Sequence, residues 1–408
     1  MTSSPQEPGW RRSVGVIHSV GSWILVLGLG VAALLVVTPA PSLALFRLGL
    51  IVTEYGHWLA PALVAVVLTT RARDTTGRVR RLRIGRSALA LVAASLLISP
   101  AVRASNAAPG IAATLTEAGL TPRDPVAGRL RGTPLHALEL WLGVPVDRRP
   151  IVERTYSRST GVDLRLDFLA ASGAGEAGKP CVVVVHGGGW DSGSRKEFPE
   201  LSHYLANRGV SVASIDYRLA PRHPWPAARD DVVTALEYLR TNAVELDIDP
   251  NRFVLLGRSA GAQVAAAAAY SRADLGVCGL VALYGPMDMH FAWRHARADD
   301  ILDSPRLIAS YLGGSPTAVP TAFDEASPIG FVNASTPPTL LLHGLRDDLV
   351  WYRQSERLAE RLASMGVAHA LIQLPWANHG FDYNLSGPGG QATVYAVEHF
   401  VAAVTDSG

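Results

Sequence analysis

The chain has 408 residues, a length that suits one large catalytic domain with an extension. Its formal net charge is only +2, which gives nucleic-acid binding no electrostatic support. The two cysteines, Cys181 and Cys278, form no CxxC pair, which excludes a zinc knuckle and a disulfide-rich scaffold. Apolar residues are unevenly placed: residues 1–107 hold three long apolar runs, and the rest has the pattern of a globular α/β protein.

The three apolar runs lie at about 14–37, 45–70 and 84–104. Each can supply the roughly 20 apolar residues that a helix needs to cross the hydrocarbon core of a bilayer. Residues 1–107 are therefore predicted to form a membrane domain of three transmembrane helices in contact with lipids. A cleaved signal peptide is the alternative for the first run, but its apolar core is longer than the usual ~7–15 residues and two more runs follow.

Arginine placement sets the predicted orientation of these helices. Basic loops stay in the cytoplasm, whereas the TPAPS connection between the first two runs carries no charge. The N-terminus is therefore predicted to be cytoplasmic and the large domain extracytoplasmic. The arginines precede the first run and surround the second connection: Arg11, Arg12, Arg71, Arg73, Arg78, Arg80, Arg81, Arg83 and Arg86.

The second apolar run contains Glu54 and His57, three residues apart and so on one helix face. Ionisable groups inside a membrane are costly and often functional. The alternative is a pair bonded to each other, or to neighbouring helices, near the outer surface.

Residues 108–150 are predicted to form a linker with a short amphipathic helix, LHALELWLG, packed on the next domain. From residue 151 to 408 strand-like and helix-like runs alternate, which indicates a mainly parallel sheet with helices on both faces. Residues 286–336 are predicted to be a helical insertion over the site that forms an acyl pocket. Eight strands are predicted, at 152–156, 164–170, 181–190, 210–217, 253–257, 278–285, 339–344 and 369–375. The first two are predicted to form a hairpin. Three helices are predicted among the later strands, at 198–208, 226–240 and 353–366.

A Gly-x-Ser-x-Gly pentapeptide, GRSAG, stands between a predicted strand and a predicted helix. Its two glycines let strand and helix approach each other, and the tight turn lifts the serine hydroxyl above the sheet. The helix N-terminus behind the serine favours negative charge. Ser259 is therefore the candidate nucleophile of a nucleophile elbow, provided that a base and an anion-stabilising site lie beside it.

The carboxyl ends of two later strands carry the candidate partners of this serine. His379, in the sequence NHGF, is the candidate base. Asp347 follows a strand directly in HGLRD and is the candidate that orients the imidazole, with Asp348 and Asp288 as alternatives. The order Ser, Asp, His is the order expected of the α/β-hydrolase fold.

The triple glycine after the third strand supplies candidate anion-stabilising groups. The backbone N–H groups of Gly188, Gly189 and Ala260 can converge on a developing oxyanion, where a side chain would block the acyl group. A phosphate-binding loop is the alternative, but no Lys-Ser or Lys-Thr follows the glycines.

Residues 151–408 resemble the hormone-sensitive-lipase-like branch of the α/β-hydrolase esterases. The motifs HGGGW, DYRLAPRHPWPAARDD, GRSAG, HGLRD and NHGF follow one another in the order of that family. The resemblance implies a mostly parallel eight-stranded α/β-hydrolase fold and gives Ser259, Asp347 and His379 the roles of nucleophile, acid and base. The sequence departs from the family at Arg258, where Asp, Glu or Gly often precedes the serine.

The expected function is therefore that of a membrane-anchored serine carboxylesterase or lipase, with a small-molecule or lipid ester as substrate and no metal or organic cofactor. One alternative is a methylesterase for prenylated cysteine peptides, and the other is a non-catalytic receptor on the esterase fold. Such receptors typically lose the histidine that stands here at position 379. In the usual strand order of this fold, Cys181 and Cys278 begin strands that have another strand between them, so we expect free, buried thiols.

Overall fold

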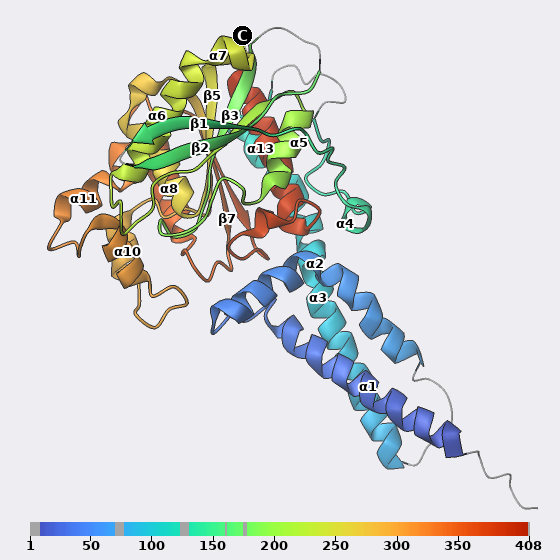
Figure 1. Ribbon diagram of the computed structural model, residues 1–408. Helices are drawn as coiled ribbons and strands as arrows, with labels where there is room; N and C mark the ends of the chain where they lie inside the picture. Colours follow the sequence, from blue (N-terminus) through green and yellow to red (C-terminus); the bar gives the residue numbers. More distant parts are fainter. Residues whose placement is uncertain (1–8, 70–76, 123–129, 160, 174–177, 407–408) are drawn as a thin grey trace, which may run out of the picture. The chain divides into compact units, whose positions relative to one another are not determined.

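The computed structural model describes residues 9–69, 77–122, 130–159, 161–173 and 178–406 (Figure 1). The chain divides into two compact units, Met1–Val102 and Arg103–Gly408. We call them the helical unit and the catalytic unit and describe each by itself.

Three helices make up the described part of the helical unit: α1 (Gly9–Leu34), α2 (Leu43–Thr69) and the first part of α3 (Gly77–Glu117). Small residues bring their backbones together. A Cβ atom on Gly56 would lie only 2.3 Å from the carbonyl oxygen of Leu97, so only glycine fits where α2 meets α3. The core of this unit consists of Val, Leu and Ala side chains from all three helices, among them Val26, Ala33, Leu63, Ala90 and Leu97.

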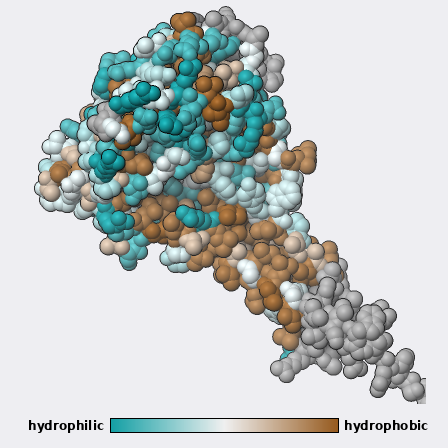
Figure 2. Space-filling model, in the orientation of Figure 1, coloured by the Kyte–Doolittle hydropathy of each residue, from teal (hydrophilic) through white to brown (hydrophobic). Residues whose placement is uncertain are grey.

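Two helices in the described residues are long and apolar enough to cross a membrane, over Leu43–Leu68 and Arg80–Glu117. The apolar part of α1 is shorter there, Val20–Leu34, so the prediction of three spanning helices is supported for only two. Apolar side chains also cover much of the outside of the unit (Figure 2), including Ile24, Val31, Trp58, Val92 and Val102.

Helix α3 runs well past the predicted end of the third apolar run at residue 104 and reaches Glu117. Its last turns are rich in alanine, a strong helix former. Ile111 and Leu115 are buried in the core of the catalytic unit, and this packing gives the continuation a reason to persist. The predicted linker is therefore partly helical, whereas its predicted amphipathic helix is a single turn, α4 (Glu139–Leu142).

The catalytic unit contains one eight-stranded sheet in the order β1-β2-β4-β3-β5-β6-β7-β8. The β1–β2 and β2–β4 pairs are antiparallel and all other neighbours are parallel, which confirms the predicted α/β-hydrolase sheet. The strands are β1 (Val152–Ser159), β2 (Val162–Leu169), β3 (Lys179–Val185), β4 (Ser211–Ile215), β5 (Ile248–Arg258), β6 (Val277–Leu283), β7 (Thr339–Gly344) and β8 (His369–Leu374).

Helices cover both faces of this sheet (Figure 1). Strand residues alternate between two cores: Val183 packs with one set of helices and Val182 with the other. The first set is α6 (Ala227–Thr241), α8 (Ala260–Ser271) and α12 (Arg353–Ser364), and the second is α5 (Pro199–Asn207) and α13 (Pro388–Thr405). A short helix, α7 (Ala243–Leu246), precedes β5.

The stretch between β6 and β7 is the insertion predicted at 286–336. It holds α9 (Met289–His295), α10 (Ser304–Leu312), α11 (Pro320–Glu325) and a 3-10 turn at Pro328–Phe331. The thiols of Cys181 and Cys278 are free, as predicted, because β5 separates β3 from β6. The predicted burial is confirmed for Cys181, whereas Cys278 is only partly buried. Burial raises the pKa of Cys278 to about 11.

Candidate active site

The turn between β5 and α8 holds Ser259 in a strained backbone conformation, with φ 51° and ψ −123°. Its N–H donates to the carbonyl oxygen of Leu283 at 2.9 Å, which ties the turn to the end of β6. The two flanking glycines are sterically required. A Cβ on Gly257 would lie 2.4 Å from Cα of Ala262, and one on Gly261 would lie 2.1 Å from the carbonyl oxygen of His186. The sequence thus folds into an elbow that presents the serine at the sheet edge.

Three candidate residues from separate strand ends meet at this elbow. His379 Nε2 lies 2.8 Å from Ser259 Oγ, and His379 Nδ1 lies 2.7 Å from Asp347 Oδ2. The imidazole can therefore accept the serine proton on one nitrogen while the carboxylate holds the proton on the other.

The alternative acids are engaged elsewhere. The Asp348 carboxylate accepts from the Asn378 side-chain amide at 2.9 Å. Asp288 caps α9 by accepting from the N–H of Phe291 at 2.8 Å, and it pairs with Arg357 at 2.7 Å. Of the three candidate acids, the structure places only Asp347 against His379.

Asp347 is fully buried yet surrounded by donors. Its second oxygen accepts from the N–H groups of Leu349 and Val350 at 2.9 and 2.8 Å, and His343 Nε2 lies 3.2 Å from Oδ2. Burial alone would raise the pKa of this carboxyl, but the charge and hydrogen bonds of His379 and His343 outweigh it and hold the pKa below its ordinary value. The group is therefore a carboxylate throughout the neutral range.

The glycine loop after β3 lies directly beside the elbow. A Cβ on Gly187 would come within 3.4 Å of the Ser259 Cβ. Gly188 and Gly189 have φ values of 104° and 59°, the left-handed region that favours glycine. Among the residues that the structure describes, no backbone carbonyl accepts from the N–H of Gly188, Gly189 or Ala260. These three donors are therefore available to a ligand, as an oxyanion hole requires.

A polar network beneath the triad was not predicted from the sequence. Arg258 is buried and its Nε donates to Asp382 Oδ2 at 2.5 Å. The Tyr284 hydroxyl donates to the other oxygen of Asp382, and the Tyr284 ring lies 4.4 Å from the His379 ring between centroids. The only sequence signal was Arg258 itself, since a cation at a buried strand end needs an acid partner.

A second buried cluster fixes the glycine loop to the insertion. Gln263, on α8, accepts from Trp190 Nε1 at 2.9 Å and from the Tyr311 hydroxyl at 3.0 Å. The two rings stack with centroids 4.5 Å apart. Gln263 also donates to the carbonyl oxygen of Ala326 at 2.7 Å, so one amide links the loop to the helices that follow β6.

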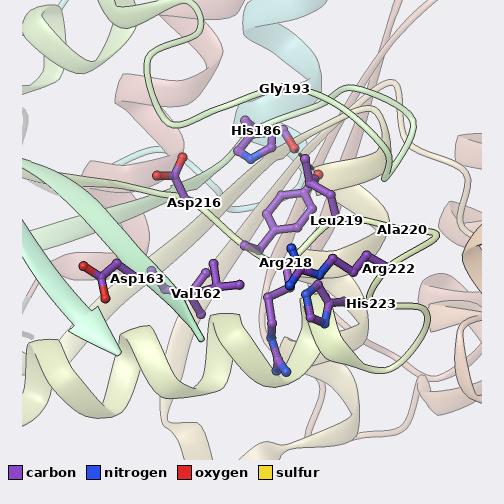
Figure 3. Close-up of a pocket in the computed structure, with 12 residues that line it drawn as sticks. Val162, Asp163, His186, Gly193, Asp216, Arg218, Leu219, Ala220, Arg222 and His223 are labelled. Carbon is purple, nitrogen blue, oxygen red and sulfur yellow. Dashed lines mark hydrogen bonds between the residues drawn. The ribbon is translucent and has the colours of Figure 1, made fainter. Parts of the chain in front are cut away.

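A cavity of about 400 Å³ is lined by residues from the start of β2, from the loop after β3 and from the segment after β4 (Figure 3). His186 and Gly193 line one part of it, and Arg218, Arg222 and His223 gather in another. The His186 ring stacks on Tyr217 with centroids 4.2 Å apart, and burial lowers the pKa of His186, which keeps this ring neutral. No triad residue lines this cavity. The DYRLAPRHP segment supports the loop through two hydrogen bonds: the Tyr217 hydroxyl donates to the carbonyl oxygen of His186 at 3.0 Å, and the N–H of Ala220 donates to that of Trp190 at 2.9 Å.

Within the described part of the chain, no group of three or more His, Cys, Asp or Glu side chains could hold a metal ion.

The sequence of this chain is similar to a family model and to esterases of known sequence. Residues 166–362 match the BD-FAE family model. Esterase LipC of Mycobacterium tuberculosis is 32% identical over 240 residues, which are 55% of this chain and 58% of LipC. LipM of the same organism, a probable carboxylic ester hydrolase, is 28% identical over 432 residues, which cover 97% of this chain and 96% of LipM.

Solved structures show the same fold. A hyperthermophilic esterase from the archaeon Pyrobaculum calidifontis matches with a TM-score of 0.54 and 26% identity, over 63% of this chain and 86% of that one. The chain spans little more than half of LipC, whereas it spans nearly all of LipM. The sheet and the solved esterase structure show that the catalytic unit has the α/β-hydrolase fold, and the relatives to which the chain is similar carry esterase or carboxylic ester hydrolase names.

Proposed function

We propose that the chain is a membrane-anchored serine carboxylesterase or lipase that hydrolyses carboxylic esters through an acyl-enzyme on Ser259. The observation that carries this proposal is the hydrogen-bonded series from Ser259 through His379 to Asp347 at the elbow. The esterase names of LipC and LipM support the reaction class.

Acylation begins when an ester carbonyl enters between Ser259 and the glycine loop. Ser259 Oγ attacks the carbonyl carbon while His379 Nε2 takes the hydroxyl proton. The buried Asp347 carboxylate stabilises the imidazolium that forms and fixes the tautomer that places the free lone pair toward the serine. The N–H groups of Gly188, Gly189 and Ala260 stabilise the oxyanion, a contribution of about 10²–10³ in rate for one such donor.

The tetrahedral intermediate then collapses. His379 returns its proton to the alcohol oxygen, the C–O bond of the ester breaks, and the acyl group remains on Ser259. Water repeats the sequence: His379 removes a proton from it, the hydroxide oxygen attacks the acyl carbon, and the released serine oxygen takes the proton back. The products are a carboxylic acid and an alcohol.

The insertion sets the room for the acyl group in this proposal. A Cβ on Gly189 would lie 2.9 Å from Cδ2 of Leu307, so α10 lies directly over the glycine loop. Enlarging this space with Leu307→Ala is expected to raise kcat/KM for long acyl chains relative to short ones. Rates over p-nitrophenyl esters of increasing acyl length, with protein in detergent, measure this ratio. A profile identical to the wild type would place the acyl group elsewhere.

Membrane anchoring is the second part of the proposal. Helices α2 and α3 have the length and composition for two spans, and the apolar surface of α1 supports its insertion beside them. The arginine distribution favours a cytoplasmic N-terminus and, with three spans, an extracytoplasmic catalytic unit. Protease protection of the catalytic unit in sealed, oriented membrane vesicles tests this orientation.

A fluorophosphonate probe tests the chemistry. The intact protein is expected to become labelled and to lose esterase activity, whereas Ser259→Ala is expected to lack esterase activity before the probe is added and to remain unlabelled. Ser271→Ala is the matched control, because Ser271 ends the same helix and donates to the carbonyl oxygen of Ala267. Wild-type activity in Ser259→Ala would overturn the proposed nucleophile.

A further inference from the structure

Arg258 stands immediately before the candidate nucleophile and its guanidinium is buried, with 4% of the side chain exposed. A buried cation of this kind is costly unless an acid pairs with it. Asp382, whose side chain is fully buried, is that acid, at 2.5 Å from the Arg258 Nε. The ion pair therefore links the elbow to the loop that follows β8.

Asp382 also receives a bond from a third strand end. The Tyr284 hydroxyl donates to Oδ1 of Asp382, and the N–H of Tyr284 donates to the carbonyl oxygen of Leu342 at 2.8 Å. Tyr284 has a φ of 44°, an uncommon backbone conformation for a bulky residue, which fixes its ring at the end of β6. One carboxylate thus joins the ends of β5 and β6 to the histidine loop.

This network lies against the candidate base. Asp382 is three residues from His379 in the chain, and Tyr284 contacts both: its hydroxyl donates to Asp382, and its ring centroid lies 4.4 Å from the His379 ring and 5.1 Å from the Phe381 ring. Burial raises the pKa of Tyr284 far above its ordinary value, so the hydroxyl remains a donor at any working pH. The position of the imidazole therefore depends on a ring that Asp382 anchors.

Charge balance is the other consequence of the ion pair. His379 must accept a proton during acylation, and a nearby unpaired cation would disfavour the protonated form of the imidazole. Asp382 neutralises the Arg258 charge and also accepts from Tyr284, whose ring packs on His379. Asp347, in the loop after β7, bonds to His379, and His343 in β7 lies 3.2 Å from Asp347. Tyr284, directly after β6, packs on His379 and donates to Asp382, which pairs with Arg258 at the end of β5. Glu197, before α5, interacts electrostatically with Arg258.

We propose that Arg258, Asp382 and Tyr284 are positioning residues that hold His379 against Ser259 and keep its surroundings electrically neutral. This role rests on the proposed acyl-enzyme mechanism. It gives Arg258, which departs from the Asp, Glu or Gly of the resembled family, a partner and a function in this chain.

The test is the pH dependence of kcat/KM, whose acidic limb reports protonation of the base in the free enzyme. Asp382→Asn leaves the Arg258 charge without its carboxylate partner, in the network that contacts His379 through the Tyr284 ring. The acidic limb is expected to move to lower pH by roughly one unit, because a nearby positive charge disfavours protonation. At the plateau kcat is expected to fall on the order of 10-fold to 100-fold with KM little changed, because the base is less well placed.

The double variant Arg258→Met/Asp382→Asn removes both charges and avoids an unpaired buried ion, so it remains testable if the single variant folds poorly. Its acidic limb is expected to return to the wild-type position while kcat stays low. An unmoved limb in Asp382→Asn, a limb still displaced in the double variant, or a wild-type kcat in the double variant would each overturn the proposal.

Glu139→Gln is the matched control. It breaks a partly buried ion pair, between Arg131 and Glu139 at 2.6 Å, in a segment that carries no triad residue. This variant is expected to melt at a lower temperature without moving the pH profile. The two proposals can fail separately. Loss of activity in Ser259→Ala supports the acyl-enzyme mechanism, whatever the pH profile of Asp382→Asn shows about the positioning role.

Discussion

The two units of this chain are built from similar apolar residues with opposite placement. In the helical unit, small side chains meet inside and large apolar ones such as Ile24 and Val31 are 67% and 62% exposed. In the catalytic unit, strand residues such as Val183 and Leu255 are fully buried. The proposed membrane anchoring accounts for this difference, since a surface that faces lipid needs no polar cover.

Both units also bury a carboxylate completely, Glu54 in α2 and Asp347 after β7. The proposed function predicts that only the second acts in the reaction. Asp347→Asn is expected to lower kcat about 10⁴-fold, because the imidazole loses its tautomer and its counter-charge. Glu54→Gln is expected to keep kcat within about twofold. Esterase assays on both variants in detergent measure this contrast, and a large loss in Glu54→Gln would make α2 part of the catalytic machinery.

A charge placed on each surface sharpens the contrast between lipid and water. Val92 on α3 is 57% exposed, and Val92→Arg is expected to weaken membrane insertion by about 2.5–3.5 kcal/mol. Val244 of the catalytic unit is 98% exposed, and Val244→Arg is expected to change stability by less than about 0.5 kcal/mol. Membrane fractionation and thermal melting provide the two readouts. Unchanged membrane retention in Val92→Arg would mean that this face of α3 does not meet lipid.

Glycine packing at the elbow predicts a smaller effect. Gly261→Ala would place a Cβ 2.1 Å from a backbone oxygen and is expected to destabilise the catalytic unit by about 1–3 kcal/mol. Gly330→Ala meets no atom within 4 Å and serves as the control. Chemical unfolding followed by tryptophan fluorescence compares them. Equal stability of the two variants would contradict the tight approach of α8 to the glycine loop.

The smallest effect concerns acid stability. The pKa of Asp347 is lower in the folded protein than the ordinary value near 3.9, so the ionised group stabilises the fold above about pH 4. This contribution is lost as the pH falls through the folded pKa. The difference in unfolding free energy between the wild type and Asp347→Asn is therefore expected to shrink as the pH drops below 4. A difference that is constant with pH would argue against a paired carboxylate.

Strands and motifs of the catalytic unit could be predicted because each has a local cause. Each buried strand appears in the sequence as a run of apolar residues, and the motifs GRSAG, HGLRD and NHGF come at the ends of such runs. The ion pair of Arg258 with Asp382 could not be predicted, since 124 residues separate its partners and nothing local joins them. The continuation of α3 was missed for a related reason: the chain turns from apolar to alanine-rich near residue 104, and only the core it meets explains why the helix persists.

That continuation has a practical consequence for anyone who wishes to isolate the hydrolase as a soluble fragment. Leu115 and Leu120 are 0% and 3% exposed, in a core shared with side chains from α5 and α13. Cutting the chain at residue 151, where the first strand region begins, would remove these side chains and expose apolar residues of the core that they share. A fragment of the catalytic unit should therefore begin at or before residue 103, so that it retains the part of α3 that belongs to its core.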